Sequence, residues 1–245
     1  NTAPSKLELQ AMAPWLSALS SNSVPLACDG YPFAFTLNGS ASDDLLPSWS
    51  FSNTSNGTQY RFRWESPDGL SATIEVSLPE PGAADWTLRF QNTGSRASFP
   101  ISDIQSLRAS LKAAAAGSVL HTHAGLLHGF EAEPPKSLNL TTPPVVLQSA
   151  GGTSSMSWLP WAQLEWPATC AGLSITVGWS GNWHAAFSRS TAVVGFGIWQ
   201  ATPSYPRLSL LPGEAIRGVR VLTLTYTNHT TLSLHDTGLN RHRRY

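Results

Sequence analysis

Turn-forming residues recur along this sequence about every eight to twelve positions, with short β-prone runs between them. The segments Pro67–Gly69, Pro79–Gly82 and Leu211–Glu214 each combine proline with glycine, which set the backbone angles that tight turns need. Runs such as Tyr60–Trp64 and Trp86–Phe90 alternate apolar with polar residues, as strands with one buried face do. The pattern predicts an all-β, antiparallel fold of two packed sheets with little helix, rather than alternating βαβ units.

One segment, residues 102–116, is compatible with two structures. Its alanine-rich composition and its Ser102–Asp103 start favour a capped helix. Leu107, Ala109 and Leu111 instead alternate with polar neighbours, as they would in a strand. Propensity alone favours the helix, and the residues themselves leave both structures open.

Charge is scarce and balanced, with 15 lysines and arginines against 15 aspartates and glutamates in 245 residues. Charged residues make up 12% of the chain, about half the usual share of roughly 25%. No basic stripe precedes the last five residues, which argues against a nucleic-acid partner. No run of about twenty apolar residues occurs, so we expect no membrane span. Without an internal repeat or a low-complexity linker, the chain is expected to form one large domain.

Five Asn-x-Ser/Thr sequons occur in polar, turn-like contexts. Attached glycans would keep a surface with so few charges soluble. We therefore expect a secreted, N-glycosylated protein. The acceptor residues of the sequons are Asn38, Asn53, Asn56, Asn139 and Asn228.

The only two cysteines, Cys28 and Cys170, lie far apart in the sequence. An even number of cysteines in a secreted chain favours a disulfide, which is our prediction for this pair. Two buried thiols are the alternative.

Histidines form the densest titratable cluster, at His121, His123 and His128. The first two would share one face of a strand, but no carboxylate follows at ligand spacing. We expect neither a metal nor a cofactor, because the chain also lacks a phosphate-binding loop, His-Glu-x-x-His and Cys-x-x-Cys.

Two carboxylate pairs are candidates for glycosidase residues, Asp43–Asp44 and Glu131 with Glu133. A glycosidase holds two carboxyl groups about 5 to 10 Å apart across a sugar, a geometry that sequence neighbours seldom meet. The first pair follows Ser42 and is predicted to lie in a capped helical turn, and the second adjoins a proline pair in a predicted loop.

Six of the ten tryptophans lie between residues 158 and 199. Two of them, Trp179 and Trp183, border the Ser-Gly-Asn turn of the segment Gly178–Trp183. A tryptophan can fill a core or offer a flat platform to the apolar face of a sugar. Most of these rings are expected in the core, and the exceptions are predicted beside the turn, at Trp179, Asn182 and Trp183.

The segment Gly178–Arg189 closely resembles a signature of the N-terminal domain of glycoside hydrolase family 36, the α-galactosidases or melibiases. Further blocks resemble the family in the same order, and together they cover residues 24–245. These blocks are Pro32–Phe35, Leu45–Trp49, Asp85–Gly94, Ile101–Leu107, Leu159–Leu164 and Leu208–Glu214.

The resemblance implies a large antiparallel β-supersandwich over residues 24–235. An N-terminal extension or a first strand would occupy residues 1–23, and residues 236–245 resemble the family's lead-in to a (β/α)₈ barrel. The segment Asp103–Leu107 is strand in the family, so the resemblance overrules helix propensity there. The family's catalytic aspartates lie on the barrel, so we expect no catalytic residue in this chain.

The sequence differs from the family pattern at two places that affect the expected function. Gly129–Pro134 replaces the family's Asp-Phe pair ahead of a proline, and Arg241–Arg244 resembles either a basic processing site or ordinary lead-in sequence. One hypothesis is the non-catalytic sandwich of a secreted α-galactosidase-like hydrolase, in which Trp183 supports the turn while Trp179 or Asn182 faces the barrel or a sugar. The other is a free-standing secreted glycoprotein module with a structural, self-assembling or carbohydrate-binding role.

Overall fold

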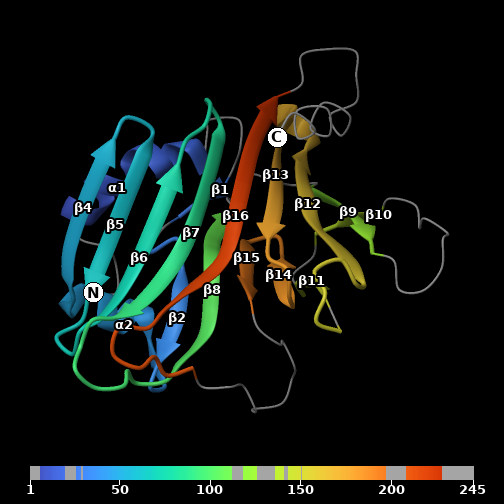
Figure 1. Ribbon diagram of the computed structural model, residues 1–245. Helices are drawn as coiled ribbons and strands as arrows, with labels where there is room; N and C mark the ends of the chain where they lie inside the picture. The colour runs from blue at the N-terminus through green and yellow to red at the C-terminus, as the bar shows by residue number, and fades with distance from the viewer. Residues whose placement is uncertain are drawn as a thin grey trace.

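The computed structural model describes residues 6–19, 26–28, 30–111, 118–125, 136–140, 143–149, 151–196 and 208–227. Two antiparallel sheets pack face to face over one core (Figure 1). The expected all-β sandwich is confirmed.

The larger sheet has nine strands among the described residues, and each strand runs antiparallel to the strands beside it. Over Gln59–Glu65 and Ala83–Asn92 alternation places one side of the strand in the core, as the sequence pattern predicts. In sheet order the strands are β10 (Lys136–Asn139), β9 (Val119–Ala124), β12 (Trp158–Trp166), β13 (Ala171–Gly178), β16 (Ala215–Thr227), β7 (Ala83–Asn92), β6 (Leu70–Ser77), β5 (Gln59–Glu65) and β4 (Ser50–Asn56).

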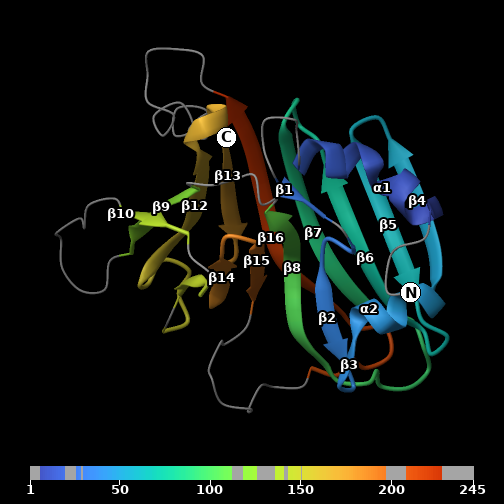
Figure 2. The same cartoon turned by 180° about the vertical axis from the view of Figure 1, so that it is seen from behind.

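The smaller sheet has seven strands in the described part of the chain. It faces the viewer in Figure 2, which is turned by 180° from Figure 1. Its strands follow the order β11 (Val145–Gln148), β14 (Trp183–Phe187), β15 (Thr191–Phe196), β8 (Ile101–Leu111), β2 (Ala34–Leu37) and β3 (Ser40–Ala41), with β1 (Leu26–Ala27) also paired to β8.

Strand β8 covers most of the ambiguous segment, so the strand expectation is confirmed and the helix favoured by propensity is wrong there. β15 pairs with one edge of β8, and β1 and β2 pair with the other. Sheet hydrogen bonds on both edges, together with buried Leu107 and Ala109, outweigh the local helix preference.

The N-terminal region, where an extension or a first strand was expected over residues 1–23, contains a helix, α1 (Lys6–Leu19), so the first strand is wrong there. Glu8, Met12 and Trp15 recur at helical spacing, and all three are buried. Buried and exposed residues do not alternate along this segment, as they would in a strand. The other helical turns are short: α2 (Ser42–Leu45), and the 3₁₀ turns η1 (Leu46–Ser48) and η2 (Pro167–Thr169).

Helix α1 closes the core over the inner face of β5–β7 through aromatic contacts. Trp15 stacks on Phe62 at 6.0 Å between ring centroids and meets Trp86 edge-on at 5.4 Å. The Glu8 carboxylate accepts hydrogen bonds from Trp64 Nε1 at 2.5 Å and from the Tyr31 hydroxyl at 3.3 Å. Burial, reinforced by the charge of Glu8, raises the pKa of Tyr31. No described helix has the length and apolar character of a membrane-spanning segment.

Candidate functional site

The turn between β13 and β14 carries the chain from the larger sheet to the smaller one. Trp183 begins β14 with only 1% of its surface exposed. Its indole N–H donates to the Ser154 carbonyl at 2.6 Å, and its backbone N–H donates to Ser149 Oγ at 2.9 Å. Trp183 therefore supports the turn, as one of the two hypotheses expects, and its buried ring offers almost no surface to a sugar or a barrel.

Asn182 is half-buried and also supports the turn. Its Oδ1 accepts a hydrogen bond from the Gly152 N–H at 2.8 Å, and the Ser149 hydroxyl donates to the Gly181 carbonyl at 3.3 Å. These bonds join the turn to the loop between β11 and β12. The Asn182 amide therefore has a local structural role.

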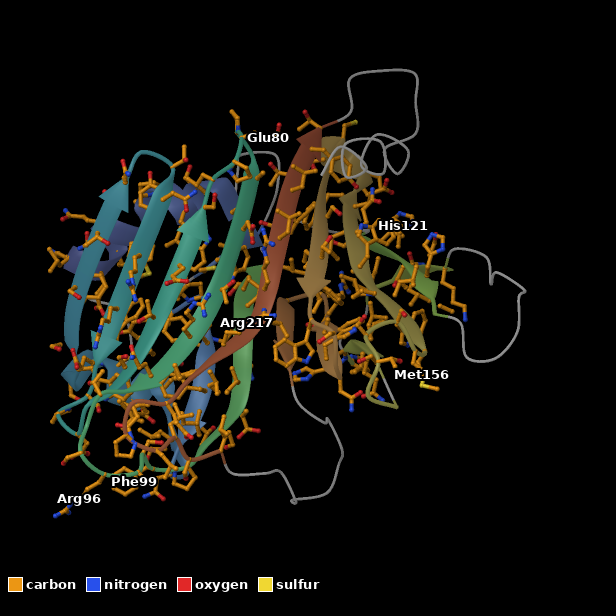
Figure 3. The ribbon with its side chains drawn as sticks, in the orientation of Figure 1. Glu80, Arg96, Phe99, His121, Met156 and Arg217 are labelled. Atoms are coloured by element: carbon orange, nitrogen blue, oxygen red, sulfur yellow. The ribbon has the colours of Figure 1, made fainter. Side chains whose placement is uncertain are left out.

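Trp179 is half-buried, like Asn182, and packs partly against the core. Arg217 of β16 places its guanidinium 5.3 Å from the centre of the Trp179 ring, a cation–π contact. On the other side of the turn, a Cβ added at Gly181 would lie 3.1 Å from Trp179 Nε1, so glycine allows the indole to lie close to the backbone. Figure 3 shows Arg217 near the middle of the larger sheet's outer face.

A pocket of about 820 Å³ lies at the end of the sandwich where the β2–β3 turn, η1 and the loops 66–70 and 94–99 meet. The volume falls in the range of small-molecule sites. Trp49 and Phe99 contribute aromatic rings, Asp68 and Arg96 contribute opposite charges, and several serine hydroxyls line the rest. Sequence reasoning missed this pocket because its walls come from separate loops with no common motif.

Two large apolar side chains are exposed at this end of the sandwich, Phe99 in the pocket lining and Leu211 outside it. Phe99 is 51% exposed and Leu211 is 57% exposed. Paired hydrogen bonds between Ser98 and Leu210, at 2.8 and 2.9 Å, hold the two segments side by side. Figure 3 shows Phe99 and Arg96 projecting from this end of the molecule. Exposed neighbouring apolar side chains of this kind suit contact with another protein surface.

A polar network crosses the outer face of β10, β9 and β12. His121 Nδ1 lies 2.8 Å from Ser137 Oγ, and its Nε2 lies 2.8 Å from Glu165 Oε2. Further along this face, Gln163 donates to the Tyr226 hydroxyl, whose pKa is raised mainly by burial. The serine–histidine–carboxylate chain arises because Ser137 and His121 are opposite each other in the β9–β10 register.

The other titratable candidates have structural partners or lie outside the described residues. Asp43 in α2 forms a bidentate ion pair with Arg108, at 2.8 and 2.6 Å. The helical turn predicted for Asp43–Asp44 is confirmed, but its predicted cap is wrong, because Ser42 is the first helical residue and no side chain caps the turn. The His123 ring lies 5.9 Å from that of Trp161. Within the described ranges, no group of three or more His, Cys, Asp or Glu side chains is arranged to bind a metal. His128, Glu131 and Glu133 lie outside the described residues.

The two cysteines lie outside the strands, in separate parts of the sandwich, and are thiols. Cys28 follows β1 and donates to the Arg108 carbonyl at 3.7 Å, whereas Cys170 follows η2 and donates to the Pro167 carbonyl at 3.8 Å. The predicted disulfide between them is therefore not formed. Each sulfur bonds to the backbone of its own region of the sandwich, and Cys170 is exposed rather than buried.

Four of the five predicted glycan acceptors are described, and all four are exposed. Asn38 occupies the β2–β3 turn with a φ of 50°, and Asn139 ends β10. Asn53 and Asn56 both lie on β4, the edge strand of the larger sheet, so they are not both in turns as expected. Asn228 and the expected lead-in at residues 236–245 lie outside the described residues.

No protein-family model and no curated protein matches the sequence. Among solved structures, an α-galactosidase from Lactobacillus brevis superimposes with a TM-score of 0.59 and 14% identity, over 81% of this chain and 30% of that one. The family 36 α-galactosidase AgaA from Geobacillus stearothermophilus gives 0.59 and 18%, over 80% and 30%. A second enzyme from that bacterium, AgaB, gives 0.59 and 17%, over 82% and 31%.

The similarity covers most of this chain and less than a third of each enzyme. At these low sequence identities the structural similarity shows a shared fold. It agrees with the resemblance of the sequence blocks to family 36. The described chain thus has the fold of a β-sandwich that makes up about 30% of family 36 α-galactosidases.

Proposed function

We propose that this chain is the non-catalytic sandwich of a secreted α-galactosidase-like glycoside hydrolase, and that it braces a catalytic barrel. The observation that carries the proposal is the asymmetry of the structural match, about 80% of this chain against 30% of each enzyme. The part of the enzymes left over is large enough for a (β/α)₈ barrel, which takes about 250 residues. The carboxylates of an α-galactosidase would lie on that barrel.

The exposed pair Phe99 and Leu211 supports a bracing role, because a docked domain would remove both side chains from water. The adjoining pocket, with Trp49 at its wall and serine hydroxyls around it, offers the mixture of ring and hydroxyl groups that borders sugar sites. The AgaA enzyme has been solved in complex with raffinose, a galactose-containing sugar. We assign the same ligand class, an α-galactoside, to the parent of this chain.

A second candidate function is a free-standing secreted glycoprotein module. It is favoured by the exposed sequons at Asn38, Asn53, Asn56 and Asn139 and by the low charge of the chain. Such a module would hide Phe99 and Leu211 against another protein or a glycan.

The two functions predict different masses for the natural protein. After enzymatic removal of N-linked glycans, the bracing function predicts an intact mass larger than 26.3 kDa by a barrel of about 250 residues. The longer protein should hydrolyse an aryl α-galactoside, whereas residues 1–245 alone should not. A natural mass near 26.3 kDa would contradict the bracing function and favour the free-standing module.

A further inference from the structure

The two sheets end in strands of very different length. β10 and β11 have four residues each and β3 has two, whereas β4 has seven. β4 lies at the far side of the larger sheet from β10, and among the described strands β5 is its only neighbour (Figure 1). A long terminal strand presents a row of backbone N–H and C=O groups that can pair with another strand.

β4 also lacks the usual features that prevent edge pairing. Its sequence, Ser-Phe-Ser-Asn-Thr-Ser-Asn, contains no proline and no charged residue, and its seven residues pair with β5 without a bulge. Lysine, proline and bulges are the devices by which edge strands normally avoid association. Six of the seven residues, all except Phe51, are exposed.

The strand does carry two glycan acceptors, and they project from opposite faces. Asn53 is paired with Phe62, whose ring is buried in the core, so Asn53 lies on the core-side face of the strand. Asn56 is paired with Gln59 and shares the outer face with Thr54, which is opposite Arg61. Glycans at both positions would flank the edge on each side with bulky, hydrated groups.

A second copy of the chain fits this edge without a charge conflict. An antiparallel pairing of all seven residues of β4 with the same strand of a second copy has Asn53 at its centre, opposite Asn53 of that copy. Every cross-strand pair in this register is neutral, and the interface is self-complementary, as a two-fold dimer requires. Two Asn53 glycans would meet at the symmetry axis and block the approach.

We propose that β4 is a self-association edge controlled by N-glycosylation: chains lacking glycans at Asn53 and Asn56 dimerise through antiparallel β4 pairing, and chains that carry them stay monomeric. The interface joins the larger sheets of two copies into one continuous sheet. Glycan occupancy then sets the oligomeric state. This inference is independent of whether a barrel follows the sandwich, because it concerns only the edge strand.

The experiment compares the molar mass of two chains by light scattering after size-exclusion chromatography. The wild-type chain is expressed in a glycosylating eukaryotic host, and the Asn53→Gln/Asn56→Gln variant in the same host, with occupancy measured by mass spectrometry. The glycosylated chain should have the mass of a monomer plus its glycans. The double variant should have twice the monomer mass, in a concentration-dependent equilibrium. The matched control Asn38→Gln, which removes a sequon in the β2–β3 turn, should remain monomeric.

Two further variants separate loss of glycans from the change of asparagine and test the strand itself. Ser55→Ala/Thr58→Ala also removes both sequons but keeps both asparagines, and it should dimerise like the double Gln variant. Thr54→Lys, added to the Ser55→Ala/Thr58→Ala variant, places a lysine on the edge strand of each copy. It should restore the monomer without disturbing the core. The proposal fails if the chains without these glycans stay monomeric, if Thr54→Lys leaves the dimer intact, or if the occupied wild-type chain dimerises through β4.

Discussion

Beneath α1 and β5–β7 aromatic rings contact one another in the core, a region called here the aromatic end, whereas toward the opposite end polar side chains are buried on the outer face of β12, called the polar end. Trp15, Phe62 and Trp86 contact one another beneath α1. At the other end, Gln163 and Glu165 are buried on the outer face of β12. Both ends bury rings as well as polar groups, since Glu8 is buried beneath α1 and Trp183 is buried in β14, but the ring–ring contacts of Trp15 and the polar network of β12 are each confined to one end.

The difference has an energetic consequence. Buried rings lose transfer free energy and leave a cavity when they are truncated, whereas buried polar groups lose stability mainly when a partner is left without its hydrogen bond. The aromatic end should therefore respond most to changes in side-chain volume. The polar end should respond to pH and to the removal of single hydrogen-bonding atoms.

The largest effect is expected at the centre of the aromatic end. Trp15→Ala should lower the free energy of unfolding by about 3–5 kcal/mol, because the indole is fully buried and contacts two other rings. Urea unfolding followed by circular dichroism measures the change. Leu7→Ala in the same helix is the control, since Leu7 is 62% exposed and should change stability by less than about 0.5 kcal/mol. Equal losses for the two variants would mean that α1 does not close the core.

The next effect is a pH dependence at the polar end, caused by His184 on β14. Burial lowers the pKa of His184 from 6.5 to about 4, partly opposed by the charge of Asp103. Between pH 6.5 and 4 the unfolded chain therefore binds a proton that the folded chain does not, so stability falls as the pH is lowered through this window. The loss should reach up to roughly 3 kcal/mol.

The contribution of His184 is isolated by comparing urea unfolding of the wild type and His184→Gln at pH 7 and pH 4.5. The variant should lose less stability between the two pH values, since it carries no imidazole to protonate. Parallel pH profiles would show that His184 is exposed to water in solution.

A smaller effect is expected within the polar network. Glu165→Ala removes the acceptor for His121 Nε2 in a site where Glu165 is 8% exposed, and should cost about 1–3 kcal/mol. Glu165→Gln keeps an acceptor oxygen and should cost less. Ser137→Ala, at the exposed side of the same histidine, should change stability by less than about 0.5 kcal/mol. A larger loss for Ser137→Ala than for Glu165→Ala would contradict the buried, structural role of this network.

The sequence predicted the aromatic end better than the polar end. Alternation in Tyr60–Trp64 and Trp86–Phe90 placed the strands and their buried rings correctly, because one face of each strand is uniformly apolar. Alternation gave no sign that Gln163 and Glu165 would be buried, since polar residues at those positions normally indicate a solvent-exposed face. Their burial depends on neighbouring strands, which only the sheet register brings together.

The candidate sites show the same limit. The buried position of Trp183 depends on bonds to Ser149 and Ser154, which lie some thirty residues earlier in the chain. The pocket beside Phe99 is formed by loops from four parts of the sequence. Helix α1 was not predicted although its buried residues have helical spacing, because Pro14 lies inside the segment and proline normally ends or kinks a helix.

The smallest effect concerns the turn between the two sheets. Trp179→Ala removes a half-exposed ring and its contact with Arg217, and should cost about 0.5–1 kcal/mol, the usual size of an exposed cation–π contact. Trp183→Ala, four residues later, should cost about 3–5 kcal/mol because its indole is buried and hydrogen-bonded. Arg217→Ala should reproduce most of the Trp179→Ala loss, and the double variant should lose less than the sum of the two. An additive double variant would mean that ring and guanidinium do not interact in solution, and that the accessible surface of Trp179 is retained for another partner.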